Sequence, residues 1–176
     1  MAILGRDYFF GLGHTNIPNA WEGRWRGLDY YREDFNDPNQ VTLWKGQGHH
    51  PRTGAMYDMS CPTPHWLDED QLKMDFPWEH LGWSFYRMGP GDNLPMHVDQ
   101  FNRFKQKFDC TNKIIVRGLI MLEDWKSGHY LEVDDRSITN WHAGQYWWWT
   151  EKTPHMAANL GTEDRYTLQL TGLMEL

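Results

Sequence analysis

From residue 82 onward, the sequence consists of short apolar stretches that turn residues separate at close intervals. Residues 89–92 (Gly-Pro-Gly-Asp) form one such turn, and residues 113–122 form the most apolar stretch. This pattern is typical of short β-strands rather than helices. We expect about eight strands, the number that a jelly roll needs. Their expected ranges are 83–88, 95–99, 113–122, 129–133, 138–141, 146–150, 155–159 and 165–171. Phe101, Phe104 and Phe108 recur at helical spacing and predict a short inserted helix.

The first 81 residues show little periodicity, and no change of composition separates them from the rest. We therefore expect one domain over residues 1–176, with residues 1–81 as a partly helical cover on a β core at 82–176. Residues 7–10 suggest a short strand, and residues 11–16 a turn. Residues 45–64 are rich in Gly, Pro, Ser and His and predict a loop, and a short helix is expected within 65–72. We expect the segment 49–64 to border the mouth of the functional site.

Three metal-binding side chains lie on expected strands. His97 and Asp99 are two residues apart, so an extended strand directs both side chains from the same face. His155 lies on a later strand. Two imidazoles and one carboxylate can occupy one face of an octahedral iron and leave three positions open. Each residue alone is more often structural than functional, but their combination predicts a metal site.

The last expected strand carries a candidate anion site. Arg165, Thr167 and Gln169 share one face of this strand, and Leu168 and Leu170 point to the other. If the polar face lines the interior of the fold, Arg165 and Thr167 reach the same anion. An arginine can grip a carboxylate through two parallel hydrogen bonds.

The ordered set His97-x-Asp99, His155 and Arg165-x-Thr167 resembles the Fe(II)- and 2-oxoglutarate-dependent dioxygenases. The resemblance covers about residues 82–172. Within it, residues 128–133 (Gly-His-Tyr-Leu-Glu-Val) resemble the family's Gly-Gly-x-Leu strand with the second glycine replaced. Residues 142–144 (His-Ala-Gly) resemble the tight turn before the strand that leads to the distal histidine.

The resemblance implies a double-stranded β-helix, the jelly roll of the cupins, and an Fe(II) site formed by His97, Asp99 and His155. It implies that 2-oxoglutarate chelates the iron and that Arg165 and Thr167 hold its distal carboxylate. The implied reaction uses molecular oxygen and is most simply the hydroxylation of an amino acid, a peptide or another small molecule. Tyr130 is a further candidate donor to 2-oxoglutarate.

Arg117 complicates this assignment because it interrupts an apolar strand and would be costly to bury without a partner. It can pair with Glu132 or Asp134, or it can compete with Arg165 for the carboxylate of 2-oxoglutarate.

The substrate is not identified by the sequence. Candidate substrate contacts near the expected site are Trp83, Tyr86, Arg87, Gln100, Asn102 and Arg103. In the run Trp147-Trp148-Trp149, successive rings point to opposite faces of a strand, so at least one is expected in the core and another can face a cleft.

Charge and composition restrict the partners. The formal net charge is −7, with 17 basic and 24 acidic side chains, which makes a nucleic-acid partner unlikely. No apolar run is long enough to span a membrane. The two cysteines are too few for a disulfide framework, and charge appears too early at the N-terminus for a secretory signal. We therefore expect a cytoplasmic protein, and the oligomeric state stays open.

Two other classes share parts of this pattern. A metal-dependent cupin enzyme that does not use 2-oxoglutarate would need the three metal ligands but not Arg165-x-Thr167. A non-catalytic jelly-roll module could bind sugars through its 11 tryptophans and would not need the metal ligands.

Overall fold

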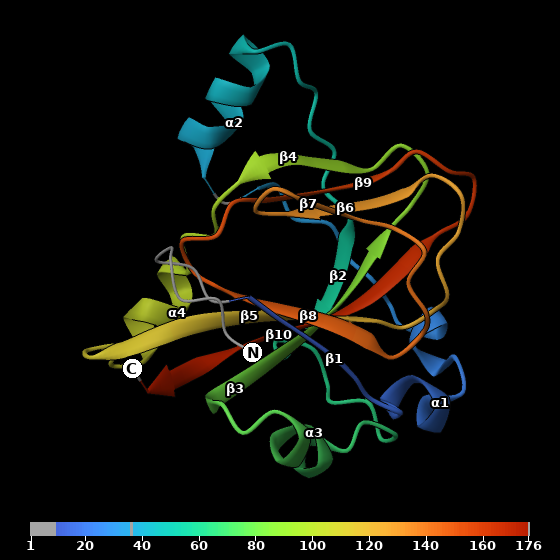
Figure 1. Cartoon of the computed structure of the whole chain (residues 1–176), viewed down its shortest axis with the longest axis vertical. Helices are drawn as coiled ribbons and strands as arrows, with labels where there is room; N and C mark the ends of the chain where they lie inside the picture. Colours follow the sequence, from blue (N-terminus) through green and yellow to red (C-terminus); the bar gives the residue numbers. More distant parts are fainter. Residues whose placement is uncertain (1–9, 36, 176) are drawn as a thin grey trace.

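The fold is that of a double-stranded β-helix in which two antiparallel sheets face each other (Figure 1). It is seen in a computed structural model that describes residues 10–35 and 37–175. The larger sheet has the strand order β1-β8-β5-β10-β3-β2, and the smaller sheet has the order β4-β9-β6-β7. The strands are β1 (Phe10–His14), β2 (Ala55–Asp58), β3 (Glu79–Met88), β4 (Asn93–His97), β5 (Lys113–Met121), β6 (His129–Val133), β7 (Arg136–Ile138), β8 (Gln145–Thr150), β9 (His155–Asn159) and β10 (Arg165–Glu175).

The sequence pattern explains why the larger sheet is covered on both faces. In β10, Leu168 and Leu170 are fully buried on one face, whereas Arg165 and Thr167 are buried on the other. An apolar face packs against a protein layer, while a buried polar face needs specific partners. The polar face of β10 points toward the smaller sheet, so Arg165 lines the space between the two sheets.

Two main apolar clusters stabilise this arrangement. The inner cluster lies between the sheets and contains Met88, Leu119, Met121, Leu131 and Trp147, among others. The outer cluster covers the opposite face of the larger sheet and is formed by Trp21, Trp25, Leu72, Trp83, Phe85, Ile120, Leu168 and their neighbours. Its helical layer comes from α1 (Ile17–Trp21), the 3-10 helix η1 (Arg24–Gly27) and α3 (Glu69–Asp75). Figure 1 shows α1 and α3 below the larger sheet.

A buried carboxylate joins the N-terminal segment to the core. Asp92 has no exposed side-chain surface, and Arg32 donates to its two oxygens at 3.0 and 2.9 Å. Arg52 approaches the same carboxylate at 3.0 Å, and Gly89 donates its backbone N–H at 2.7 Å. Charge-assisted hydrogen bonds of this kind hold a segment in a defined place. They position residues 32–35 and 52–56 beside the gap between the sheets.

The structure confirms the mainly β jelly-roll fold and corrects parts of the N-terminal expectations. Within the stretch 11–16, Gly11 to His14 belong to β1, which pairs with β8; residues 7–9 lie outside the described residues. The expected loop 45–64 contains β2, which pairs with β3. The helix α2 (Pro38–Gly46) was not expected, because its one buried side chain, Trp44, gives no periodic apolar face. The inserted helix is α4 (Asn102–Lys107).

The later elements follow the expected pattern closely. β9 has the bounds expected from the sequence, whereas β10 continues to Glu175. The expected strand at 138–141 lies earlier, as β7 at Arg136–Ile138. Gly144 adopts φ +86°, and a Cβ there would lie 2.1 Å from the Thr15 carbonyl oxygen, so the expected tight turn requires glycine. No helix among the described residues is long and apolar enough to cross a membrane.

Candidate active site

Strand pairing brings the three expected metal ligands together. His97 ends β4 and His155 begins β9, and the two residues are direct partners in the sheet. Their ring centroids are 4.3 Å apart. Asp99 follows two residues after His97, and its two carboxylate oxygens lie 3.8 Å from the Nε2 atoms of His97 and His155. The ligand atoms of all three residues lie within 4.8 Å of one another.

Backbone hydrogen bonds orient both imidazole rings. The Nδ1 atom of His97 donates to the Pro95 carbonyl at 2.7 Å, and that of His155 donates to the Thr153 carbonyl at 3.0 Å. Because Nδ1 carries the proton, the lone pair of each Nε2 is free to bind a metal. Burial lowers the pKa of His97 to about 4, with a further contribution from His155, and burial also lowers the pKa of His155. Both rings are therefore neutral near pH 7, and the donor set fits a divalent metal ion.

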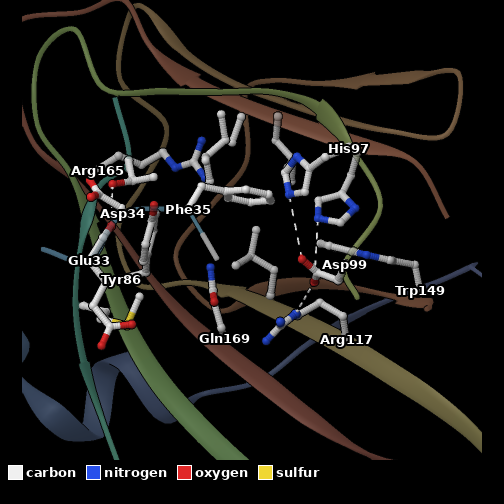
Figure 2. Close-up of a pocket in the computed structure, with 17 residues that line it drawn as sticks. Glu33, Asp34, Phe35, Tyr86, His97, Asp99, Arg117, Trp149, Arg165 and Gln169 are labelled. Carbon is white, nitrogen blue, oxygen red and sulfur yellow. Dashed lines mark hydrogen bonds and ion pairs between the residues drawn. The ribbon is translucent and has the colours of Figure 1, made fainter. Parts of the chain in front are cut away.

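Asp99 has an additional partner that the sequence analysis did not foresee. The Nε of Arg117 donates to its Oδ2 at 2.9 Å. Burial alone would raise the pKa of Asp99, but Arg117 and the two histidines outweigh it and hold this pKa below its usual range. Of the two alternatives for Arg117, pairing with Glu132 or Asp134 is corrected, because Asp99 is its carboxylate partner. Competition with Arg165 for 2-oxoglutarate stays a prediction. Figure 2 places Arg117 beside the three metal ligands and apart from Arg165.

Aromatic rings surround the histidines. Phe35 lies edge-on to His97 with ring centroids 5.2 Å apart, and Trp44 lies edge-on at 5.7 Å. On the other side, Trp149 is 5.0 Å from His155. These rings restrict water at the histidines, and Trp149 is the ring of the tryptophan run that faces the cavity.

A cavity of about 170 Å³ extends from the metal ligands to Arg165. Arg165 is only 4% exposed, yet no acidic side chain among the described residues forms an ion pair with it. The one hydrogen bond of its side chain in the described structure runs from NH1 to the Tyr130 carbonyl, at 2.7 Å. Burial lowers the pKa of Arg165 to about 10, so the guanidinium is still charged at neutral pH. The cavity therefore has the candidate metal ligands at one end and a buried cation at the other.

Two buried polar atoms at the Arg165 end of the cavity have no hydrogen-bond partner in the part of the chain that the structure describes. They are the Nε of Arg165 and the hydroxyl oxygen of Thr167, which is 1% exposed. Among the described residues, the only other such atom is the Nε1 of Trp25, which belongs to the outer cluster. Buried polar groups normally have hydrogen-bond partners, so a concentration of unpaired groups at one place indicates that a ligand completes it.

Tyr86 borders the same end of the cavity. Its hydroxyl accepts the backbone N–H of Gly54 at 2.7 Å, which leaves its own proton available for a ligand. Burial raises the pKa of Tyr86 to about 12, so the phenol remains protonated at neutral pH. Of the expected substrate contacts, Tyr86 is the one that lines the cavity, and it faces the anion end.

The other candidates lie elsewhere. Tyr130 is corrected: its hydroxyl bonds to Glu132 and Ser137, and only its backbone carbonyl reaches Arg165. The strand alternation gives the reason, because the neighbouring Leu131 takes the inward position. Trp83 packs in the outer cluster and donates to Glu69 at 2.8 Å, so its ring faces away from the site.

The remaining substrate candidates are on the surface around α4 and β3. Gln100 is exposed and lines neither the cavity nor the groove described below. Asn102 and Arg103 are exposed residues of α4 that border that groove. The Arg87 guanidinium stacks on the Tyr30 ring at 5.3 Å, outside the cavity. None of these four contacts the three metal ligands.

Two N-terminal segments line the cavity, and sequence reasoning foresaw one of them. Thr53 and Met56 belong to the segment 49–64, which was expected to border the site. Glu33, Asp34 and Phe35 also contribute to the wall and were not expected. No periodicity marks residues 33–35, because the Asp92 contacts and a bridge between Tyr31 and Met56 hold this segment rather than a regular element. Only knowledge of which distant segments contact each other could have placed these residues beside the cavity.

No family model matches the chain, and no curated protein matches it. Solved structures do resemble it. A prolyl-4-hydroxylase from Pseudomonas putida aligns over 95% of this chain and 92% of its own, with a TM-score of 0.61 and 16% identity. The 2-oxoglutarate-dependent epimerase SnoN of nogalamycin biosynthesis gives a TM-score of 0.60 at 10% identity, over 96% of this chain and 77% of its own.

A third similar structure is a prolyl hydroxylase from Trichoplax adhaerens, in complex with a peptide of hypoxia inducible factor. It gives a TM-score of 0.60 at 12% identity, over 93% of this chain and 82% of its own. At these identities, the likeness establishes a shared double-stranded β-helix fold. The His-Asp-His cluster and the buried arginine are properties of this chain's own geometry.

Proposed function

We propose that this protein is an Fe(II)- and 2-oxoglutarate-dependent oxygenase that hydroxylates a small-molecule or peptide substrate. The observation that supports this most strongly is the buried Arg165, which lies across the cavity from the metal ligands and has no acidic partner among the described residues. A metal-binding cupin that does not use a dicarboxylate has no need of such a group, and a sugar-binding module needs neither end of the cavity.

The roles of the metal ligands follow from their contacts. His97, Asp99 and His155 would hold the iron, with both imidazoles oriented by backbone carbonyls. Three ligands on one side leave room for 2-oxoglutarate and oxygen. When bound, the iron supplies the redox chemistry that converts 2-oxoglutarate and oxygen to succinate and carbon dioxide while one oxygen atom enters a C–H bond of the substrate.

The protein's own contribution at the other end is binding and orientation. Arg165 and the Thr167 hydroxyl would receive the distal carboxylate of 2-oxoglutarate, which supplies the missing partners of both groups. The Tyr86 hydroxyl, which is protonated at neutral pH, is a further donor at this end. Phe35 and Trp149 limit the access of water to the metal ligands.

Similar structures are consistent with this proposal, because two prolyl hydroxylases and a 2-oxoglutarate-dependent epimerase share the fold. They extend the range of candidate substrates to peptides as well as small molecules.

The proposal is tested with protein purified without oxygen and loaded with Fe(II). We expect one iron per chain, saturable binding of 2-oxoglutarate to the iron-loaded protein, and slow succinate formation once oxygen is admitted. Metal binding without affinity for 2-oxoglutarate would favour a cupin of another reaction class. The absence of metal binding would favour a non-catalytic module.

A further inference from the structure

A surface groove adjoins the cavity at Arg117 and Gln169, which line both. We call this shared wall the junction. The groove has a volume of about 480 Å³, which is larger than the cavity itself. Its walls include Met59, which follows β2, together with Ser84 of β3 and Phe104 of α4. A molecule in this groove therefore contacts two residues that also line the cavity with the metal ligands.

The side chain of Gln169 points into the cavity at this junction (Figure 2). It lies on the inner face of β10, two residues beyond Thr167, and is partly buried. Its amide forms no hydrogen bond with the residues that the structure describes, which leaves two N–H donors and one carbonyl acceptor for a ligand. The role proposed above for 2-oxoglutarate does not use this group.

Arg117 offers donors at the same place. Its Nε bonds to Asp99, and its NH1 bonds to the Thr171 hydroxyl at 2.7 Å. A guanidinium has five N–H groups, so three remain without a partner among the described residues. The ring of Phe101 lies 4.9 Å from the guanidinium carbon and covers one of its faces. The free N–H groups therefore interact with ligands in the plane of the guanidinium.

Among the described residues at the junction, unpaired hydrogen-bond donors outnumber acceptors. Three N–H groups of Arg117 and two of the Gln169 amide stand against the single carbonyl of that amide. The acidic wall residues lie elsewhere: Glu33 is 3.7 Å from Arg103, and Asp34 lies near the Arg165 end.

We infer that the primary substrate carries a carboxylate, that Arg117 and Gln169 bind this carboxylate beside the metal, and that the rest of the substrate occupies the groove. This inference rests on the proposed function and specifies the substrate class. A carboxylate matches the excess of donors over acceptors at the junction, and a charged acceptor forms stronger hydrogen bonds with a guanidinium than a neutral carbonyl does.

The test uses two probes of the same shape that differ by one charge, N-acetylphenylalanine and N-acetylphenylalaninamide. Ligand-observed NMR measures their binding to protein loaded with Zn(II) and 2-oxoglutarate, in which no turnover takes place. We expect the acid to bind about ten- to a hundredfold more tightly than the amide, because the acid forms hydrogen bonds to a charged group. We expect Gln169→Leu to weaken binding of the acid, and Gln169→Glu to remove the preference for it.

Gln106→Glu is the matched control, because it makes the same charge change on α4 outside both the cavity and the groove. It should leave the preference intact. Equal binding of both probes, binding of neither, or displacement of 2-oxoglutarate by the acid would overturn the inference. If 2-oxoglutarate itself does not bind to the metal-loaded wild type, the proposed function fails first, and this inference fails with it.

Discussion

At the metal end of the cavity, the three candidate metal ligands each have a partner within the protein, whereas at the anion end two buried polar atoms have none among the described residues. His97 and His155 bond to backbone carbonyls, and Asp99 bonds to Arg117. At the other end, Arg165 keeps an unbonded Nε and Thr167 an unbonded hydroxyl. The first set is assembled by the fold itself, and the second set is complete only when a ligand binds.

This difference has an energetic consequence. A buried polar group without a partner costs about 1–3 kcal/mol, and a charged group costs more. The apo fold therefore carries an unfavourable contribution at Arg165, and a bound carboxylate removes it. Because this unfavourable free energy is already present in the apo protein, its removal contributes to the affinity for the carboxylate.

The largest effect is expected at the metal ligands. Asp99→Ala, His97→Ala and His155→Ala each remove one of only three ligands, so stoichiometric metal binding should be lost in each. Changes that only disturb the partners of metal ligands commonly cost about 10–100-fold in affinity, and loss of a ligand should cost more. Metal content after anaerobic purification and dialysis measures this. Wild-type metal content in all three variants would show that the cluster is not the metal site.

A smaller effect is expected for Thr167→Val, which keeps the shape of the side chain and removes its hydroxyl. A hydrogen bond to a charged group contributes roughly 1.5–3 kcal/mol, so the affinity for 2-oxoglutarate should fall about ten- to a hundredfold. Thr171→Val is the matched control, since its hydroxyl bonds to Arg117 at the opposite end. If Thr171→Val lowers the affinity for 2-oxoglutarate as much as Thr167→Val does, the loss is not specific to the Thr167 hydroxyl, and this hydroxyl does not bind the carboxylate as proposed.

The two arginines should affect stability in opposite directions. In metal-free protein, Arg165→Met removes a buried charge without an acidic partner and should raise the free energy of unfolding by about 1–3 kcal/mol. Arg117→Met leaves Asp99 without its main partner and should lower it by a similar amount, about 1–3 kcal/mol. Denaturant unfolding with a chelator present measures both. If Arg165→Met lowers the free energy of unfolding as much as Arg117→Met does, the expected difference between the two ends of the cavity is contradicted.

The smallest effect concerns pH. The folded pKa of His97, about 4, lies below its value of 6.5 in an unfolded chain, so the unfolded state binds more protons between these values. The contribution of His97 to stability is therefore complete above pH 6.5 and is lost as the pH falls toward 4. NMR titration of the imidazole in metal-free protein should show the ring neutral throughout pH 5–7. A midpoint near 6.5 would contradict the burial of this ring.

Much of the fold and of the metal end could be predicted from the sequence because the signals are local. Turn residues between short stretches marked β9, and alternation assigned the two faces of β10. The spacing of His97 and Asp99 indicated that the two side chains lie together, although the expected strand 95–99 ends at His97 and Asp99 lies just beyond it. The partners of Arg117 could not be predicted, because its bonds to Asp99 and Thr171 join segments 18 and 54 residues away. The cavity wall at residues 33–35 was also missed, since the contacts of Asp92 fix that segment.

Tyr130 shows a different limit. The sequence analysis named its hydroxyl as a candidate donor to 2-oxoglutarate, yet the alternation along β6 directs the side chain outward and leaves only the carbonyl for Arg165. The same alternation rule, applied to β6 with Leu131 facing inward, would have corrected the expectation. The substrate candidates are divided by the structure: Tyr86 lines the cavity, Trp83, Asn102 and Arg103 border the groove, and Arg87 and Gln100 line neither. Closeness in sequence to the metal ligands could not make this distinction, because it does not indicate the face of the sheet.

The central claim is that Arg165 binds the distal carboxylate of 2-oxoglutarate, and a ligand–variant cycle tests it most directly. Affinities of 2-oxoglutarate and of 2-oxopentanoate, which has a methyl group in place of that carboxylate, are measured for metal-loaded wild type, Arg165→Ala and the control Arg87→Ala. Arg165→Ala should weaken 2-oxoglutarate by about 3–5 kcal/mol, a hundredfold to a few thousandfold, with metal affinity kept. It should leave 2-oxopentanoate nearly unchanged, and Arg87→Ala should change neither. Equal losses for both ligands, or wild-type affinity for 2-oxoglutarate in folded Arg165→Ala, would contradict the claim.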